Sequence, residues 1–202
     1  MILSHPESDH LNGLVYLLEN FKVEYLVKNT DTNDTANYKK MIRLCREREI
    51  KIITPPFFPE QMTANGICLT FFNSTAAHET LNNRSLVFKL GFEDFSFLFP
   101  GDILKEREFR LAREYGFKLK SDVLMAPHHG SSTSSTQFFL DKVEPESVII
   151  PCGWQNRYRF PHPAVLNRYR EAGIKIYRTD KHGAVFTVSA GNSFHITTYK
   201  DL

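Results

Sequence analysis

Cysteine is scarce in this chain, and the positions of the few that occur exclude two common uses of the residue. The 202 residues include three cysteines, Cys45, Cys68 and Cys152, which are odd in number and far apart in the sequence. This spacing argues against a disulfide framework and against a zinc site built from thiolates. We therefore expect the three thiols to be small buried side chains in a reducing compartment.

Long apolar segments and clusters of like charge are also missing. No stretch is apolar over the length that a bilayer requires and no leader peptide is visible, so the chain as it stands is predicted to be cytoplasmic. Lysine and arginine number 25 against 23 aspartates and glutamates. No run of Lys and Arg indicates a basic patch, so composition alone gives no evidence for a nucleic-acid partner.

The chain contains enough apolar material for a core. Hydrophobic residues make up 42% of the sequence and include 17 phenylalanines, so we expect one domain over residues 1–202. Apolar periodicity predicts helices over 11–21, 36–49, 105–116, 136–143 and 164–172. Strand patterns cover 23–27, 51–54, 67–72, 85–90, 95–99, 122–126, 147–151, 174–178, 184–189 and 194–199. Helices at both ends with hairpins between them favour an α/β (α+β) fold of the αββα sandwich type.

The most informative stretch is Ser4-His5-Pro6-Glu7-Ser8-Asp9-His10. It follows a short apolar run and precedes an amphipathic helix, so a strand ending in a tight loop can direct four side chains into one small volume. Imidazole nitrogens and carboxylate oxygens suit zinc, manganese or iron. A single histidine here would fit an ordinary polar turn. The combination of His5, Glu7, Asp9 and His10 instead predicts a metal site.

Two further groups of polar residues follow predicted strands. Asp102 comes after the strand over 95–99 and a glycine, where its two oxygens could bridge two metals or its carboxylate could cap the next helix. His128 and His129 end the strand over 122–126, and Gly130-Ser131 form a turn whose N–H groups could approach an anion.

A third histidine lies in a rigid segment. His162 stands between Pro161 and Pro163, which restrict the backbone, but from the residues alone a histidine at an ordinary helix start explains the pattern better than a ligand does. The neighbouring Arg157, Tyr158 and Arg159 could contact a phosphate backbone, although exposed loop arginines are common. Residues 57–66 are expected to be a loop whose Phe57 and Phe58 anchor it to the core or act as a lid.

In their order along the chain, these motifs resemble those of the metallo-β-lactamase superfamily. Residues 5–10 match its His-x-(His/Asp)-x-Asp-His signature, with Glu7 at the third ligand position. Pro127-His128-His129-Gly130-Ser131 and the turn Asn82-Asn83-Arg84 before a Ser-Leu-Val strand are similar to the hydrolase domain of ComEC-type DNA-uptake proteins. The resemblance implies an αββα sandwich that lacks its first N-terminal strands, because strands normally precede the signature loop.

The resemblance also implies how the site would work. Two divalent ions, manganese or zinc, would be held by His5, Glu7, Asp9, His10, Asp102, His128 and His162. Asp102 would bridge the ions, and His128 is preferred over His129 as a ligand, although the two could be exchanged. Catalytic roles would fall to Asp9, His129 and His162, with support from Asn83 and Ser131.

The implied activity is hydrolysis of a phosphodiester in nucleic acid, with single-stranded DNA as the expected substrate. The family's hydrolase domain is usually fused to a membrane channel, which makes such a channel a candidate partner. Two alternatives stay open: hydrolysis of a small phosphodiester in the same site, and a non-catalytic remnant that keeps the fold. Glu7 is one methylene longer than the usual aspartate, a change that can alter metal choice.

Overall fold

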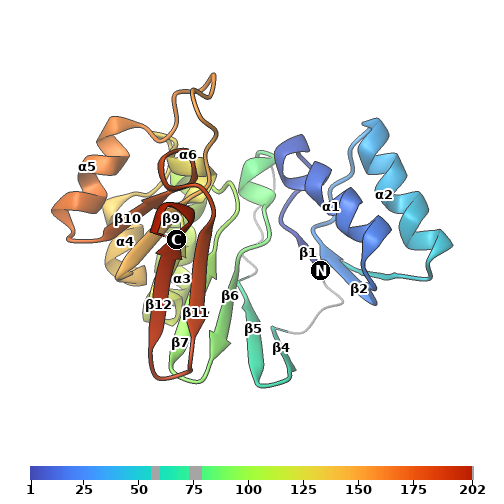
Figure 1. The fold of residues 1–202 in the computed structure, drawn as a ribbon, viewed down its shortest axis with the longest axis horizontal. Coiled ribbons are helices and arrows are strands. Elements are labelled where there is room, and N and C mark those ends of the chain that lie inside the picture. The colour runs from blue at the N-terminus through green and yellow to red at the C-terminus, as the bar shows by residue number, and fades with distance from the viewer. Residues whose placement is uncertain (56–59, 73–78, 202) are drawn as a thin grey trace.

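The first quarter of the chain forms a small parallel sheet with two helices on one face (Figure 1). This structure is a computed structural model, and it describes residues 1–55, 60–72 and 79–201. Strands β1 (Ile2–Leu3), β2 (Tyr25–Lys28) and β3 (Lys51–Ile53) pair in this order. Parallel neighbours require a crossover connection, and here α1 (Ser8–Asn20) and α2 (Ala36–Glu47) supply the two crossovers.

A larger sheet of seven strands makes up most of the remaining chain, in the order β10-β9-β8-β7-β6-β5-β4. Neighbouring strands from β4 to β7 are antiparallel, and neighbouring strands from β7 to β10 are parallel. The strands are β4 (Gln61–Ala64), β5 (Ile67–Phe71), β6 (Phe88–Phe92), β7 (Phe95–Phe99), β8 (Val123–Met125), β9 (Ser147–Ile150) and β10 (Lys175–Arg178). Helices α3 (Lys105–Tyr115), α4 (Gln137–Val143) and α5 (Pro163–Glu171) connect the parallel strands.

The two sheets face each other with helices on their outer sides. In β2, Leu26 packs with α1 and α2, whereas its neighbour Val27 packs against Phe71 and Leu86 of the larger half. This alternation follows from the period of two along a strand. Leu98 and Val148 bury the opposite face of the larger sheet against α3, α4 and α5. The αββα sandwich predicted from the sequence is therefore confirmed.

A final hairpin covers part of the larger sheet. After α6 (Thr179–His182), β11 (Val185–Ser189) pairs with β12 (Phe194–Thr198). Phe194 and Ile196 pack against Phe97 and Ile149 of the sheet. The sequence predicted this hairpin. It predicted a turn over 179–183, and the structure has one turn of helix there. Of the helices in the described part of the chain, none combines the length and apolarity that a membrane crossing requires.

Three sequence expectations differ from the structure. Residues 61–64 were expected to be part of a loop, but they form the edge strand β4, which pairs with β5. Phe57 and Phe58 of the same predicted loop lie outside the described residues. Strand β6 begins at Phe88 rather than at residue 85, because the Leu86 amide donates to the carbonyl of Ser4, the residue just after β1, 2.9 Å away. Of the cysteines, only Cys45 is fully buried, and Cys68 and Cys152 are half-buried.

Helix α3 is tied to the start of α4 by one buried carboxylate. Glu108 is fully buried and accepts the backbone N–H groups of Ser135 and Thr136, the latter at 2.7 Å. Burial raises the pKa of Glu108 to about 7. We expect Glu108→Ala to lower the free energy of unfolding by about 2–4 kcal/mol, because two buried donors lose their acceptor.

Urea unfolding followed by circular dichroism measures this loss. Glu106→Ala is the control, since Glu106 lies on the same helix with its side chain 53% exposed, and a change below about 0.5 kcal/mol is expected for such a position. Equal unfolding midpoints for the two variants would contradict the role given to Glu108.

Candidate active site

The loop after β1 carries the first set of polar side chains, and the start of α1 orients two of them. Helix α1 begins at Ser8, so Asp9 and His10 lie in its first turn rather than in a loop before it. His5 precedes the helix and is fully buried. The hydroxyl of Ser4 lies 3.2 Å from the Nδ1 atoms of both His5 and His10 and holds the two rings side by side.

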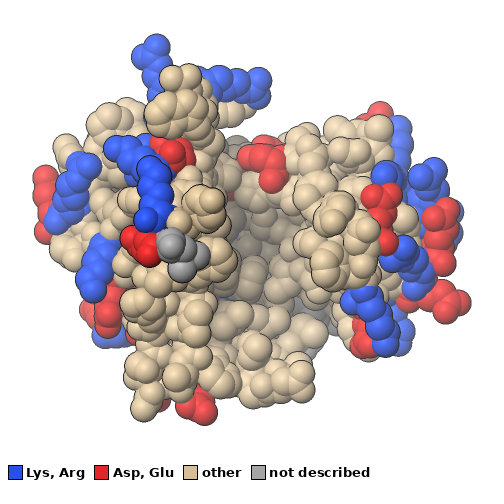
Figure 2. All heavy atoms as spheres, in the orientation of Figure 1, with Lys and Arg blue, Asp and Glu red and all other residues tan. Residues whose placement is uncertain are grey.

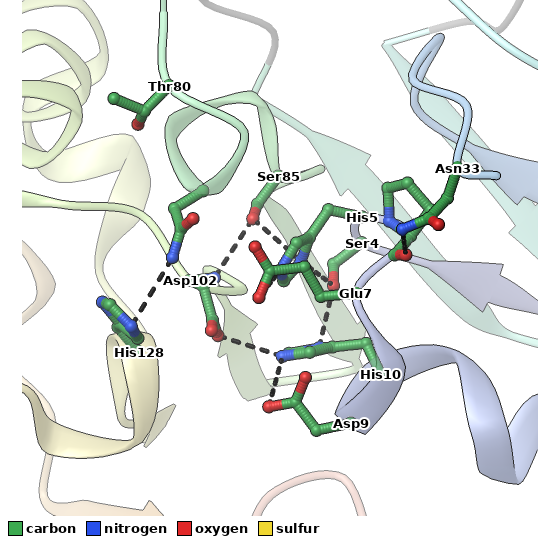
Figure 3. A network of polar contacts seen from close by, with 12 residues as sticks. Ser4, His5, Glu7, Asp9, His10, Asn33, Thr80, Ser85, Asp102 and His128 are labelled. Carbon is green, nitrogen blue, oxygen red and sulfur yellow. Dashed lines mark hydrogen bonds and ion pairs between the residues drawn. The ribbon is translucent and has the colours of Figure 1, made fainter. Parts of the chain in front are cut away.

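Asp9 and His10 meet two residues from the larger sheet. His10 Nε2 lies 3.2 Å from Asp102 Oδ1, and His129 Nε2 lies 3.2 Å from Asp9 Oδ2 and 3.6 Å from Asp102 Oδ2. One ligand atom from each of these four residues lies within 4.8 Å of the other three. Figure 3 shows Asp102 reaching toward His10 across the gap between the two halves. We call Asp9, His10, Asp102 and His129 the four-residue cluster.

Gly101 allows the three chain segments around Asp102 to approach closely. It has a φ of +62°, and a Cβ on it would lie 2.7 Å from the Ser85 Cβ and 3.1 Å from the Ser4 Cβ. A side chain at this position would therefore separate β1, β7 and the turn before β6. With glycine there, Ser85 Oγ accepts the Asp102 amide at 3.1 Å and lies 3.3 Å from His5 Nδ1.

The two histidines after β8 point in different directions. His128 and His129 both have positive φ, 48° and 54°. His129 Nδ1 donates to the Pro151 carbonyl at 2.8 Å. Because a carbonyl can only accept, Nδ1 must carry the proton of the neutral ring. The lone pair is therefore on Nε2, and this nitrogen faces Asp9 and Asp102. His128 instead has its Nε2 3.5 Å from Asn82 Nδ2. The geometry therefore favours His129 over His128 as a ligand. This is the reverse of the preference drawn from the sequence, which left the exchange open.

The electrostatics of the site favour cation binding. When the His129 ring is protonated, its Nε2–H donates to Asp9, and this hydrogen bond holds the pKa of Asp9 well below its usual range. Burial disfavours ionisation of Asp102, but the hydrogen bond and charge of His10 outweigh it and lower the pKa of this carboxyl. Burial lowers the pKa of His5 to about 4 and also lowers the pKa of His128. Ionised carboxylates and neutral imidazoles are the forms that bind a metal.

Glu7 behaves differently from the two aspartates. Its Oε2 lies 3.9 Å from His5 Nε2, and its pKa is raised by burial and by the nearby Asp102 and Asp9 carboxylates. The hydrogen bond to Asp9 raises the pKa of His129, although burial of the ring opposes this. Glu7 thus lies beside an excess of negative charge that a bound cation would neutralise.

Two ring nitrogens support the fit to a metal. His5 Nε2 and His128 Nδ1 are buried and make no hydrogen bond within the described residues. A buried polar atom without a partner costs free energy, and a divalent cation would satisfy such nitrogens as well as the carboxylates beside them. The donor set of imidazole and carboxylate fits a zinc or manganese ion.

The remaining predicted residues lie apart from the four-residue cluster. His162 is exposed, and its Nδ1 accepts the Ala164 amide at 3.2 Å, so it caps α5. Asn83 is buried and its Oδ1 accepts the Leu104 amide at 2.7 Å. Ser131 Oγ lies 2.9 Å from Thr133 Oγ1. Asn83 and Ser131 thus fix the loops that carry the site.

The sequence reasoning missed Ser4, Ser85 and the Pro151 carbonyl. Both serines lie inside motifs that were recognised, but serine is too common in turns to be assigned a role without coordinates. The carbonyl has no sequence signal at all, because any residue at position 151 supplies one.

An open cavity lies beside the cluster. It has a volume of about 500 Å³, which falls in the range of small-molecule sites. Figure 2 shows a hollow between the two halves of the molecule, with acidic side chains near its mouth. One wall holds Glu7, Asp9, Asp102, His128 and His129, and the other is the loop between β9 and α5. The cluster is therefore open to a substrate of appreciable size.

Comparison with known proteins agrees with the fold. The profile of the metallo-beta-lactamase superfamily matches residues 1–154, and the chain belongs to this superfamily. It is similar to ComE operon protein 3 of Bacillus subtilis (strain 168), with 30% identity over 192 residues, 92% of this chain and 24% of that protein. Competence protein ComA of Neisseria gonorrhoeae is 41% identical over 104 residues, 52% of this chain and 15% of that protein. The predicted resemblance to ComEC-type proteins is confirmed.

The matches cover part of each competence protein, and a solved structure shares the fold. The chain spans about a quarter or less of the length of both competence proteins. Among solved structures, CmlA, a diiron β-hydroxylase from Streptomyces venezuelae, has a TM-score of 0.52 at 13% identity and covers 88% of this chain and 42% of its own. This similarity concerns the fold alone.

Proposed function

We propose that this chain is a metal-dependent phosphodiesterase that hydrolyses DNA, with single-stranded DNA as substrate. The observation that carries the proposal is the four-residue cluster, whose ligand atoms lie within 4.8 Å of one another beside an open cavity. The similarity to a competence protein and to ComE operon protein 3 supports DNA over other phosphodiesters. A membrane channel is the proposed partner.

Two divalent ions, manganese or zinc, are the proposed cofactors, with Asp102 between them. His5 and Glu7 would hold the first, and Asp9, His10 and His129 the second. When bound, such ions ionise water near neutral pH and neutralise charge on the phosphoryl oxygens.

The protein's own groups supply orientation. Asp9, whose side chain is 58% exposed at the cavity, accepts a hydrogen bond from the attacking water and orients it. His129 Nδ1 donates to the Pro151 carbonyl, so this ring is fixed in position. His128 lines the same cavity and is proposed to contact the substrate beside the leaving oxygen. His162 would have to approach from outside, since it caps α5.

Cleavage of end-labelled DNA tests the proposal. We expect the chain to cut single-stranded DNA in manganese, and we expect EDTA to stop the reaction. Asp102→Ala should slow cleavage by at least about a hundred-fold, because a group that stabilises transition-state charge is lost. Asp141→Ala is the matched control, since Asp141 is an exposed carboxylate on α4 that does not line the cavity.

The other outcomes identify the alternatives. Undiminished cleavage by Asp102→Ala would exclude this site. Hydrolysis of a chromogenic phosphodiester without cleavage of any DNA would indicate a small substrate. A folded chain that neither cleaves nor binds manganese would be a non-catalytic member of the superfamily.

A further inference from the structure

The loop between β9 and α5 carries aromatic and basic side chains that the proposed chemistry does not use. Trp154 is 73% exposed and Tyr158 is 60% exposed. Arg157 and Arg159 are exposed in the same loop. The loop projects from the rest of the fold in Figure 1, and the matching projection in Figure 2 carries Lys or Arg side chains. Large exposed aromatic rings beside a cavity indicate a binding surface.

The rings form a continuous path into the site. Tyr158 and Phe160 are stacked, with centroids 5.5 Å apart and planes at 20°. Phe160 meets the ring of His128 edge-on at 5.6 Å. Tyr158 and Phe160 line the same cavity as Asp9 and His129. A group stacked on Tyr158 would therefore lie within the cavity that leads to the four-residue cluster.

The loop is held in one shape by Asn156. Its Nδ2 donates to the Phe160 carbonyl at 2.7 Å and to the Gly153 carbonyl at 3.1 Å, and its Oδ1 accepts the Phe160 amide at 2.9 Å. The Arg159 amide donates to the Asn156 carbonyl at 2.9 Å. A surface that is already ordered loses little conformational entropy when it binds.

The charge of the loop complements the charge of the site. Glu7, Asp9 and Asp102 line the cavity on one side and repel a polyanion. Arg157 lines the opposite side and lies with its Cζ 4.6 Å from the Tyr158 ring centroid. A guanidinium over an aromatic ring offers a cation for phosphate next to a flat apolar face. A nucleotide presents both of the matching groups.

We propose that Trp154, Arg157, Tyr158 and Phe160 form a binding surface for unpaired bases, which positions a single strand for hydrolysis. This inference rests on the proposed function. Aromatic rings bind bases by stacking on faces that are free only outside a duplex. Arg157 binds the backbone phosphate next to the stacked base. The loop therefore selects single-stranded over double-stranded nucleic acid and contributes to KM rather than to the chemical step.

Binding and kinetics are measured separately to test this. Fluorescence anisotropy with a short labelled oligothymidylate in EDTA reports binding of the full chain without cleavage. We expect Tyr158→Ala and Trp154→Ala each to weaken binding about ten-fold, the scale of one stacked base. In manganese, Tyr158→Ala should raise KM for the oligonucleotide by a similar factor and change kcat much less.

Two further variants sharpen the test. Phe117→Ala is the matched control, because Phe117 is 62% exposed with Lys142 Nζ 4.3 Å from its ring centroid, yet it does not line the cavity; its binding should equal that of the unchanged chain. Arg157→Gln should reduce the slope of log affinity against log salt by about 0.7, the value for one phosphate contact on a single strand.

The outcomes separate this inference from the proposed function. Unchanged oligonucleotide binding by Tyr158→Ala and Trp154→Ala would overturn the inference even if the chain cleaves DNA. An equal loss of single-strand and duplex affinity would also overturn it. A loss confined to the single strand supports it, even in a chain that fails to cleave.

Discussion

His129→Ala is expected to weaken manganese or zinc binding by more than about 100-fold, and to reduce hydrolysis accordingly. The reason is geometric. His129 Nε2 lies within 3.6 Å of carboxylate oxygens of both Asp9 and Asp102, while its Nδ1–H is fixed by the Pro151 carbonyl. Losing the partner that orients a ligand typically costs about 10–100-fold in metal affinity, so losing the ligand itself should cost more. Isothermal titration with each metal measures the change.

His128→Ala is the informative comparison for this prediction. Its ring lies near Asn82 and outside the four-residue cluster, so we expect metal affinity to fall by less than about ten-fold, as for a group beyond the ligands. His195→Ala, at an exposed position on β12, should bind as the unchanged chain does. If His128→Ala lost the metal while His129→Ala kept it, the assignment preferred from sequence would be correct after all.

The choice between these two histidines shows where sequence reasoning ends. The sequence placed both at the end of an apolar strand, and β8 does end there. Which ring enters the site depends on two successive residues with positive φ, a conformation that L side chains rarely adopt. Gly130 follows with a φ of +80°, and a Cβ on it would lie 2.6 Å from the Pro161 Cβ. This contact between distant segments has no local signal.

Elsewhere the prediction worked because strand ends are easy to recognise. Apolar runs that stop at His5 and at Asp102 mark the edges of two sheets, and polar side chains collect there. Helix α1 was predicted to begin three residues too late, since Asp9 and His10 are poor markers of a helix interior yet suit its first turn. The edge strand β4 was missed because Gln61–Ala64 is exposed along most of its length and lacks an alternating apolar pattern.

Arg107→Ala is expected to lower the free energy of unfolding by about 2–4 kcal/mol, because the buried Glu79 carboxylate keeps Arg110 but loses one of its two arginine partners, and the Asn83 carbonyl loses a donor. The side chains of Arg107 and Glu79 are each 5% exposed, and Nη1 lies 2.9 Å from Oε2. Burial lowers the pKa of Arg107 to about 10, so the side chain stays charged at neutral pH. Urea unfolding measures the loss. Arg113→Ala, an exposed position on the same helix, should change the midpoint little.

The same guanidinium connects stability to the site. Arg107 Nη1 also donates to the Asn83 carbonyl at 3.0 Å, two residues before Ser85, which contacts His5 and Asp102. A chain with Arg107→Ala should therefore bind metal more weakly even where it remains folded. If Arg107→Ala unfolded at the same urea concentration as Arg113→Ala, this buried pair would not be what fixes the turn before Ser85.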